Sequence, residues 1–324
     1  RQLAAARRWE DYLRDFIPTR NAELDCWQRQ ALLATDQGEA ALRNFAPFWL
    51  RGATLPAACD PVIAAWGAQG KPTPQQLWQR FVLAMKDNNQ KLARALRTAM
   101  PVADQTLADP WLSVAENPRL LLDASRLNLD DPRTWAILSD GLNRWGKRHP
   151  LEAAAALDTF KARAPALAPR LAEVERRLAL WLASDYHPSA LARLAVLPDA
   201  VVDRDVAEWR VRVCLQQGDW NAALSWLDRL PAPERDSPRW RYWRGRALET
   251  LGRSEEAKPV YQSIAGQRDY YSFLAADRLG APYAIASSPL TIPATELEAL
   301  LTRSPGLQRA QELYILGREP DAET

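Results

Sequence analysis

QQGDWNAALSWL (residues 216–227) and TLGRSEEAKPVY (residues 250–261) are two versions of one pattern. In each, a glycine and a polar turn come before an amphipathic segment, and Gly218 and Gly252 are 34 residues apart. Gly245, Ala257 and Tyr261 also stand at the spacings of a helix–turn–helix repeat. A repeat of this length and pattern is typical of stacked helix pairs. The two segments therefore predict a helical-repeat protein.

The pattern extends in both directions. LGRSEEA (251–257) returns as LGREPDA (316–322), which we expect to open the second helix of another pair. Half a helix pair cannot bury its apolar face alone, so we expect the natural protein to continue beyond Thr324. Upstream, CWQRQALLATDQGEAAL (26–42) and LAMKDNNQKLARAL (83–96) keep the helix, polar turn and helix but lose the glycine.

Helix starts are marked by capping residues. Thr73-Pro74-Gln75-Gln76 has the form of a capping box with proline at the first helical position, and residues 295–298 (TELE) form a second box. Asp131-Pro132 combines a capping residue with proline in the same way. The whole chain predicts about eighteen helices of 10–17 residues and no strand, which gives an all-α solenoid of tetratricopeptide-like pairs.

Composition excludes several classes of protein. The 324 residues include 42 basic and 40 acidic side chains, a net charge of +2, without the basic stripe that nucleic-acid binding requires. No apolar run approaches the length of a membrane span. The chain starts at Arg1 rather than methionine and has no signal peptide, so we interpret it as a processed or recombinant product.

Three cysteines leave the redox state open. Cys26 and Cys59 are 33 residues apart, and Cys214 stands alone within a helical pattern. The first two could form a disulfide in an oxidising compartment or be two buried thiols, and their spacing does not decide between these alternatives.

Residues with catalytic or metal-binding potential are few. His149 and His187 each border a proline and have no Cys, Asp or Glu partner at metal-ligand spacing. There is no phosphate-binding glycine loop, and most carboxylates alternate with Arg and Lys on helix faces. We therefore predict no catalytic residue, metal or cofactor in this chain. The best candidate for contact with a glycan or a partner lies in WRYWRGR (240–246): Trp240, Arg241, Trp243 and Arg244. The alternative is that these tryptophans fill the core.

RDYYSFLAADRLGAPY (268–283) is either a catalytic motif or a docking helix that ends at Gly280. A docking helix would turn Tyr271, Leu274 and Ala275 inward, against the preceding repeat near Tyr261, and Asp277 outward. A proline-rich break follows (281–296), where we place a boundary between a domain of residues 1–284 and the start of another at 285–324.

This stretch resembles a segment of the soluble lytic murein transglycosylases. Four further stretches resemble consecutive pieces of the same family: CWQRQALLATDQGEAAL, ACDPVIAAW (58–66), LAMKDNNQ and DSPRWRYWRGRALETLGRSEEAK (236–258). The resemblance covers about residues 7–322. It implies a right-handed α-superhelix forming a ring or U-shaped solenoid, then a helical linker domain that begins at 285–324. A lysozyme-like catalytic domain would come next, but its Glu-Ser and Met-Gln pairs do not occur in these residues.

The resemblance also implies a function. Members of this family are periplasmic enzymes of Gram-negative bacteria that cleave the MurNAc–GlcNAc β-1,4 bond of peptidoglycan and leave 1,6-anhydroMurNAc ends. This chain would position glycan strands or dock other cell-wall enzymes, as a monomer without nucleic acid or cofactor. The alternative is a non-catalytic helical-repeat scaffold that binds a protein partner.

The resemblance further implies a Cys26–Cys59 disulfide, with Cys214 as a free buried thiol. It also favours the docking role for the helix that carries Tyr270, Tyr271, Phe273 and Leu274.

Overall fold

The structure is a computed structural model that describes residues 1–123, 127–285 and 291–323. Within these ranges it contains twenty-two α-helices, several 3₁₀ turns and no strand, which confirms the all-α superhelical fold. The helices are more numerous and shorter than predicted, because tight turns divide segments that the periodicity joins. The chain divides into two compact units, Arg1–Pro231 and Ala232–Thr324.

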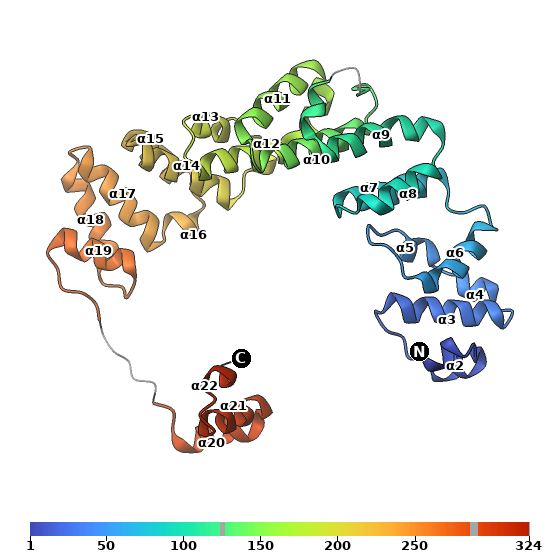
Figure 1. Ribbon diagram of the computed structural model, residues 1–324. Helices are drawn as coiled ribbons and strands as arrows, with labels where there is room; N and C mark the ends of the chain where they lie inside the picture. Colours follow the sequence, from blue (N-terminus) through green and yellow to red (C-terminus); the bar gives the residue numbers. More distant parts are fainter. Residues whose placement is uncertain (124–126, 286–290, 324) are drawn as a thin grey trace. The chain divides into compact units, whose positions relative to one another are not determined.

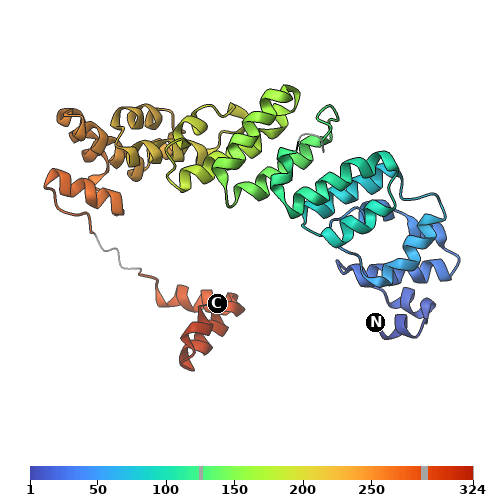
Figure 2. The same cartoon turned by 45° about the horizontal axis from the view of Figure 1, so that its top comes forward.

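The first unit holds most of the helix pairs. In it, α7 and α8 lie side by side, as do α10 and α11, and α12 packs on both α10 and α11 (Figures 1 and 2). Its helices are α1 (Gln2–Ala5), α2 (Trp9–Asp15), α3 (Ala22–Ala34), α4 (Gly38–Leu42), α5 (Phe45–Trp49), α6 (Asp60–Gly67), α7 (Pro74–Lys86), α8 (Gln90–Thr98), α9 (Val102–Glu116), α10 (Thr134–Gly146), α11 (Pro150–Arg163), α12 (Ala168–Ser184), α13 (Ala190–Ala195), α14 (Arg204–Gln217) and α15 (Trp220–Asp228). The 3₁₀ turns are η1 (Ala57–Cys59), η2 (Pro118–Leu122), η4 (Pro165–Leu167) and η5 (Asp199–Val201).

The second unit contains two groups of helices. The first comprises α16 (Ala232–Arg235), α17 (Pro238–Thr250), α18 (Ser254–Ala265) and α19 (Tyr270–Leu279), in which α17, α18 and α19 pack on one another. The second comprises α20 (Ala294–Arg303), α21 (Pro305–Ile315) and α22 (Glu319–Ala322). The predicted domain boundary at 284/285 lies beside residues 286–290, which are outside the described residues, and it stays a prediction.

Left-handed glycines close the turns that the sequence repeat predicts. Gly218, Gly252 and Gly317 have φ of 72°, 76° and 69°. After each glycine, the next N–H donates to the carbonyl five residues earlier, as Arg253 does to Leu248 at 2.9 Å. This Schellman-type geometry satisfies carbonyls at the end of the first helix and reverses the chain for the second. The correspondence between LGRSEEA and LGREPDA is therefore a correspondence in structure.

The upstream turns keep this geometry without glycine. Asp36 and Asn88 have φ of 56° and 55°, and Tyr186 has φ of 52°. The N–H of Gln37 donates to Leu32 O at 2.8 Å, the same five-residue closure as in the glycine turns. Asp and Asn tolerate the left-handed region better than other residues with a side chain. The repeat thus persists in backbone shape where its sequence signature is lost.

The capping predictions have different outcomes. Thr73 and Gln76 form the predicted capping box: Thr73 Oγ1 accepts from the Gln76 N–H at 3.3 Å, and Gln76 Oε1 accepts from the Thr73 N–H at 2.8 Å. The capping box predicted at residues 295–298 does not form. The helix α20 already begins at Ala294, with Pro293 as an N-cap that makes no side-chain hydrogen bond.

The core of the first unit is a continuous stripe from Cys26 to Val213. Its largest fully buried side chains include Trp111, Phe81 and Leu178. In contrast, no residue of α20, α21 or α22 is buried, and Tyr314 and Ile315 are 64% and 75% exposed. The apolar faces of these last three helices are therefore uncovered in this chain.

The left-handed turns predict how substitutions change stability. Asp36→Gly should raise the free energy of unfolding by about 0.5–1 kcal/mol, because glycine removes the Cβ penalty of the left-handed conformation. Gly218→Ala should lower it by about 1 kcal/mol for the same reason, since no atom lies within 4 Å of the added Cβ to cause a clash. Urea unfolding measures both changes.

Gly38→Ala is the matched control. Its added Cβ also meets nothing within 4 Å, and Gly38 is not left-handed. Destabilisation of Gly38→Ala equal to that of Gly218→Ala would show that the turn conformation is not the cause.

Candidate functional site

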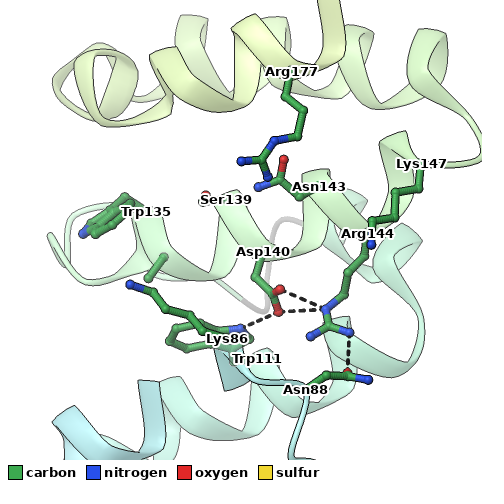
Figure 3. Close-up of a pocket in the computed structure, with 11 residues that line it drawn as sticks. Lys86, Asn88, Trp111, Trp135, Ser139, Asp140, Asn143, Arg144, Lys147 and Arg177 are labelled. Atoms are coloured by element: carbon green, nitrogen blue, oxygen red, sulfur yellow. Dashed lines mark hydrogen bonds and ion pairs between the residues drawn. The ribbon is translucent and has the colours of Figure 1, made fainter. Parts of the chain in front are cut away.

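One face of α10 is polar and lines a cavity of ≈ 500 Å³ (Figure 3). The lining residues of this helix and its C-cap follow one another at helical steps: Trp135, Ala136, Ser139, Asp140, Asn143, Arg144 and Lys147. Lys86 of α7, Asn88 of the following turn, Trp111 of α9 and Arg177 of α12 complete the wall. We call this cavity the α10 pocket.

The opposite face of α10 belongs to the core. Ile137, Leu138 and Leu142 are fully buried, and two glycines allow neighbouring helices to come close. A Cβ on Gly141 would lie 2.5 Å from a Val114 methyl, and a Cβ on Gly146 would lie 2.2 Å from a Leu178 methyl. Because α10 is packed closely against both α9 and α12, its polar face has a fixed orientation.

Asp140 and Arg144 fasten the pocket to the neighbouring helices. Arg144 Nε donates to both Asp140 carboxylate oxygens at 2.9 Å, and Trp111 Nε1 donates to Asp140 Oδ2 at 2.9 Å. The Arg144 guanidinium also donates to Asn88 Oδ1 at 2.8 Å and Met85 O at 3.2 Å. These bonds join α9, α10 and the turn after α7, so both charges have a structural role.

The other three cations of the pocket are unpaired. Lys86, Lys147 and Arg177 are exposed, and among the residues that the structure describes none of them has a carboxylate within 4 Å. Figure 3 shows Arg177 extending from α12 toward Asn143, while Arg144 turns toward Asp140 and Asn88. Asn143 Oδ1 is inaccessible to solvent and has no hydrogen-bond partner. The pocket therefore presents exposed, unpaired cations, while the Asn143 oxygen lies beneath its surface.

Sequence reasoning missed this pocket. The steps of three and four among polar residues from Ser139 to Lys147 were a signal, but the same spacing is found on any solvated helix face. Lys86 and Arg177 come from other helices and meet α10 only in the folded chain.

The structure joins Cys26 and Cys59 by a disulfide that connects α3 to the end of η1. Both cysteines are fully buried, and their Cα atoms are 4.9 Å apart. Cys214 is a free, buried thiol. Burial, together with the charge of Asp219, raises the pKa of the Cys214 thiol to about 11, so it is protonated and unreactive at neutral pH.

WRYWRGR (240–246) lies in the middle of α17, and only part of it is accessible. Trp240 is 2% exposed and fills the core, as the alternative predicted, so its ring is not accessible for contact. Arg241 pairs with Asp236 at 3.3 Å and donates to Ser263 Oγ at 3.1 Å. Trp243 and Arg244 are half-buried, and their predicted contact role stays a prediction.

The predicted docking helix is α19, and Gly280 ends it with φ of 63°. Tyr271 and Leu274 are half-buried, Phe273 packs on Tyr283 with ring centroids 5.3 Å apart, and Tyr270 is 66% exposed. Asp277 is exposed, as predicted, and accepts a hydrogen bond from Tyr283 Oη at 2.5 Å.

Tyr271 packs on the preceding helix pair, close to Tyr261, as predicted. Its ring packs on Tyr242 of α17, with centroids 5.9 Å apart, and Tyr242 in turn packs on Tyr261 at 6.0 Å. The small residues Ser272, Ala275 and Ala276 are the buried ones in α19. They let the helix approach its neighbours closely, while the tyrosine lies at the edge of the contact.

The known proteins similar to this chain include soluble lytic murein transglycosylases of two bacterial species. The soluble lytic murein transglycosylase of Escherichia coli K12 is 30% identical over 322 residues, which cover 96% of this chain and 48% of that protein. The Salmonella typhimurium protein of the same name gives the same identity and coverage. No protein-family model matches the chain.

Solved structures agree with the sequence comparison. An inactive mutant of the lytic transglycosylase Slt from Pseudomonas aeruginosa superposes with a TM-score of 0.74 and 31% identity, over 99% of this chain and 52% of that one. The 70-kDa soluble lytic transglycosylase of Escherichia coli gives 0.69 and 26%, also over 99% and 52%. Its complex with bulgecin A gives 0.70.

The paired helices and their left-handed turns define an all-α superhelical protein. Within that class, the chain is a homologue of the soluble lytic murein transglycosylases. It spans about half the length of the curated relatives it matches, 48% in each case.

The disulfide predicts a measurable contribution to stability. Cys59→Ser should lower the free energy of unfolding by about 3 kcal/mol, because the cross-link restricts a loop of about thirty residues in the unfolded chain. Cys214→Ser is the control for loss of a buried sulfur outside the cross-link. Thiol counting on the denatured, unreduced protein should give one free thiol, and a count of three would contradict the pairing.

The close packing of α10 predicts a second effect. Gly146→Ala should destabilise the protein by about 1–3 kcal/mol, since the added methyl overlaps Leu178 and the Trp181 ring. Gly67→Ala, which meets nothing within 4 Å, should change stability by less than about 1 kcal/mol. Equal thermal melting of the two variants would contradict the packing described for α10.

Proposed function

We propose that this chain is the superhelical part of a periplasmic lytic transglycosylase that cleaves the MurNAc–GlcNAc β-1,4 bond of peptidoglycan and leaves 1,6-anhydroMurNAc ends. The observation that supports the proposal is the extent of the similarity. Sequence identity of 30% runs along 96% of the chain, and the fold matches a solved lytic transglycosylase over 99% of it. A shared helical architecture alone would not give that identity along the whole chain.

The proposal assigns the cleaving glutamate to a segment outside these 324 residues. The chain has no Glu-Ser and no Met-Gln pair, the two motifs that its resemblance leads us to expect around that glutamate. Its own part would be to hold glycan strands or to dock other cell-wall enzymes. The half-buried Trp243 and Arg244 offer an aromatic and a cationic surface for either task.

The periplasmic location is supported by the buried Cys26–Cys59 disulfide, since disulfides persist in oxidising compartments. A search of the described ranges finds no helix long and apolar enough to cross a membrane.

The proposal predicts a clear difference between two proteins. The natural protein that contains this chain should release 1,6-anhydromuropeptides from purified sacculi, whereas the 324-residue chain alone should release none above a blank. Chromatography of the soluble products measures both.

The outcome also decides the alternative, a non-catalytic scaffold that binds a protein partner. Absence of anhydro products from the natural protein would favour the scaffold. Release by the 324-residue chain would contradict the proposed division of roles.

A further inference from the structure

A second, smaller cavity lies between the start of α14 and the end of α15. Its volume is ≈ 180 Å³, below the range of roughly 300–1,000 Å³ that is usual for drug-sized ligands, so only a compact group can enter it. We call it the α14–α15 pocket. Apolar, aromatic and cationic side chains make up most of its wall: Val202, Ala207, Arg210, Trp226, Arg229 and Pro231.

Two arginines of this pocket are stacked on one tryptophan. The guanidinium carbons of Arg210 and Arg229 lie 4.6 Å and 4.7 Å from the centroid of the Trp226 ring. Arg210 Nε and Nη2 also donate to Leu194 O at 3.0 Å and 2.7 Å. Stacking restricts the positions of a guanidinium, so less entropy is lost when it binds an anion. The indole thus holds the two arginines in place, and we assign it no contact with a ligand.

The charge of this arginine pair is not balanced by a carboxylate. Among the residues that the structure describes, none has a carboxylate oxygen within 4 Å of either guanidinium. Arg210 Nη1 and the whole Arg229 guanidinium likewise have no hydrogen-bond partner in these ranges. Burial, together with the charge of Arg229, lowers the pKa of Arg210. An anion beside both guanidinium groups would relieve their repulsion.

The other charged residues of the wall are already paired. Asp203 forms an ion pair with Arg176 and accepts a hydrogen bond from the Val206 N–H at 3.0 Å. Arg204 Nε donates to Glu208 Oε1 at 3.0 Å. The positive charge that is left for a ligand is therefore that of the stacked arginines.

Charge and shape together select a ligand with two parts. A carboxylate suits the site, because its two oxygens accept paired N–H bonds from a guanidinium. The side chains of Val202, Ala207 and Pro231 offer no hydrogen bond, so the group next to the carboxylate should be apolar. A simple anion would leave this apolar wall in contact with water. The end of a peptide chain has both parts when its last residue is apolar.

We propose that the α14–α15 pocket binds the carboxyl terminus of a partner protein that ends in an apolar residue. The terminal carboxylate accepts from Arg210 Nη1 and the Arg229 guanidinium, and the last side chain packs on Val202, Ala207 and Pro231. A free amino acid is a poorer ligand, because its α-ammonium group is repelled by the same arginines. The proposal uses this pocket alone and does not depend on the proposed function.

NMR titration of the isotope-labelled 324-residue chain tests the proposal, with the Trp226 indole N–H as reporter. N-acetyl-leucine has the carboxylate and an apolar side chain, whereas N-acetyl-leucinamide lacks the charge, acetate lacks the side chain and leucine adds the ammonium. N-acetyl-leucine should bind with a Kd of about 1 mM or below, and the other three at least about tenfold more weakly. Equal binding of any of the three, or no binding of N-acetyl-leucine at about 10 mM, would overturn the proposal.

N-acetyl-D-alanyl-D-alanine separates a protein partner from a peptidoglycan stem peptide. It has the carboxylate, but its last side chain is a methyl group that leaves much of the apolar wall uncovered. It should therefore bind at least about fivefold more weakly than N-acetyl-leucine. Equal or tighter binding would assign the pocket to the stem peptide and contradict the assignment to a protein chain end.

Two variants test the two parts of the site separately. Ala207→Leu fills the cavity but keeps both arginines, so it should weaken binding of N-acetyl-leucine at least about tenfold and change that of acetate by less than about twofold. Arg229→Gln removes a guanidinium and should weaken both ligands by about five- to tenfold. Arg148→Gln is its control, because Arg148 is also exposed but does not line the pocket. It should change binding by less than about twofold.

Equal effects of Arg229→Gln and Arg148→Gln would show that the ligand lies elsewhere. Unchanged binding of N-acetyl-leucine by folded Ala207→Leu would show that no side chain enters the cavity. Arg229 is exposed, so its substitution reports on the site even if Ala207→Leu does not fold. Ligand binding by the chain and release of anhydromuropeptides by the natural protein are separate measurements, so either proposal can fail while the other stands.

Discussion

One backbone hydrogen bond recurs through the helix pairs of this protein: the N–H that follows a left-handed residue donates to the carbonyl five residues earlier. It occurs after Gly218 and Gly252, and equally after Asp36 and Asn88. The bond fixes where the first helix ends and in which direction the second begins. Because it involves only the main chain, the helix pairs can keep one geometry while their side chains change.

Only one face of α10 packs in the core, and most of the opposite face is not needed to hold the helices together. Its core face is defined by Gly141 and Gly146, which bring α9 and α12 into close contact. The opposite face carries charges that the fold does not neutralise, apart from the Asp140–Arg144 pair. Lys86, Lys147 and Arg177 on this side of the helix are exposed, so solvent stabilises their charges.

The sequence predicted those features that depend on local rules. The 34-residue glycine spacing and the capping box at Thr73 both correspond to the structure, because each depends on a few consecutive residues. The box at 295–298 failed because the helix begins before it, at Ala294, behind a proline N-cap. Sequence alone left Trp240 open between the core and a contact surface, since an aromatic residue in a helix gives the same pattern in either place.

The candidate site could not be predicted from local sequence patterns. Lys86, Arg144 and Arg177 are separated by tens of residues, and nothing in the sequence states that their helices meet. Tyr271 shows the same limit: its helix and the preceding repeat on which it packs were predicted, but the sequence did not show that its ring contacts Tyr242. Periodicity indicates which face of a helix is apolar. The neighbour that covers this face is decided by tertiary packing.

The helix pairs pack mainly on their neighbours in the chain, as α7 does on α8 and α17 does on α18. Contacts between residues close in sequence have a small loop-closure cost, and proteins dominated by them fold quickly. Each pair of helices can form as soon as its own residues are available, without waiting for distant segments. Folding can therefore start at several points and spread along the chain, so that the first helices are assembled while later ones are still being made.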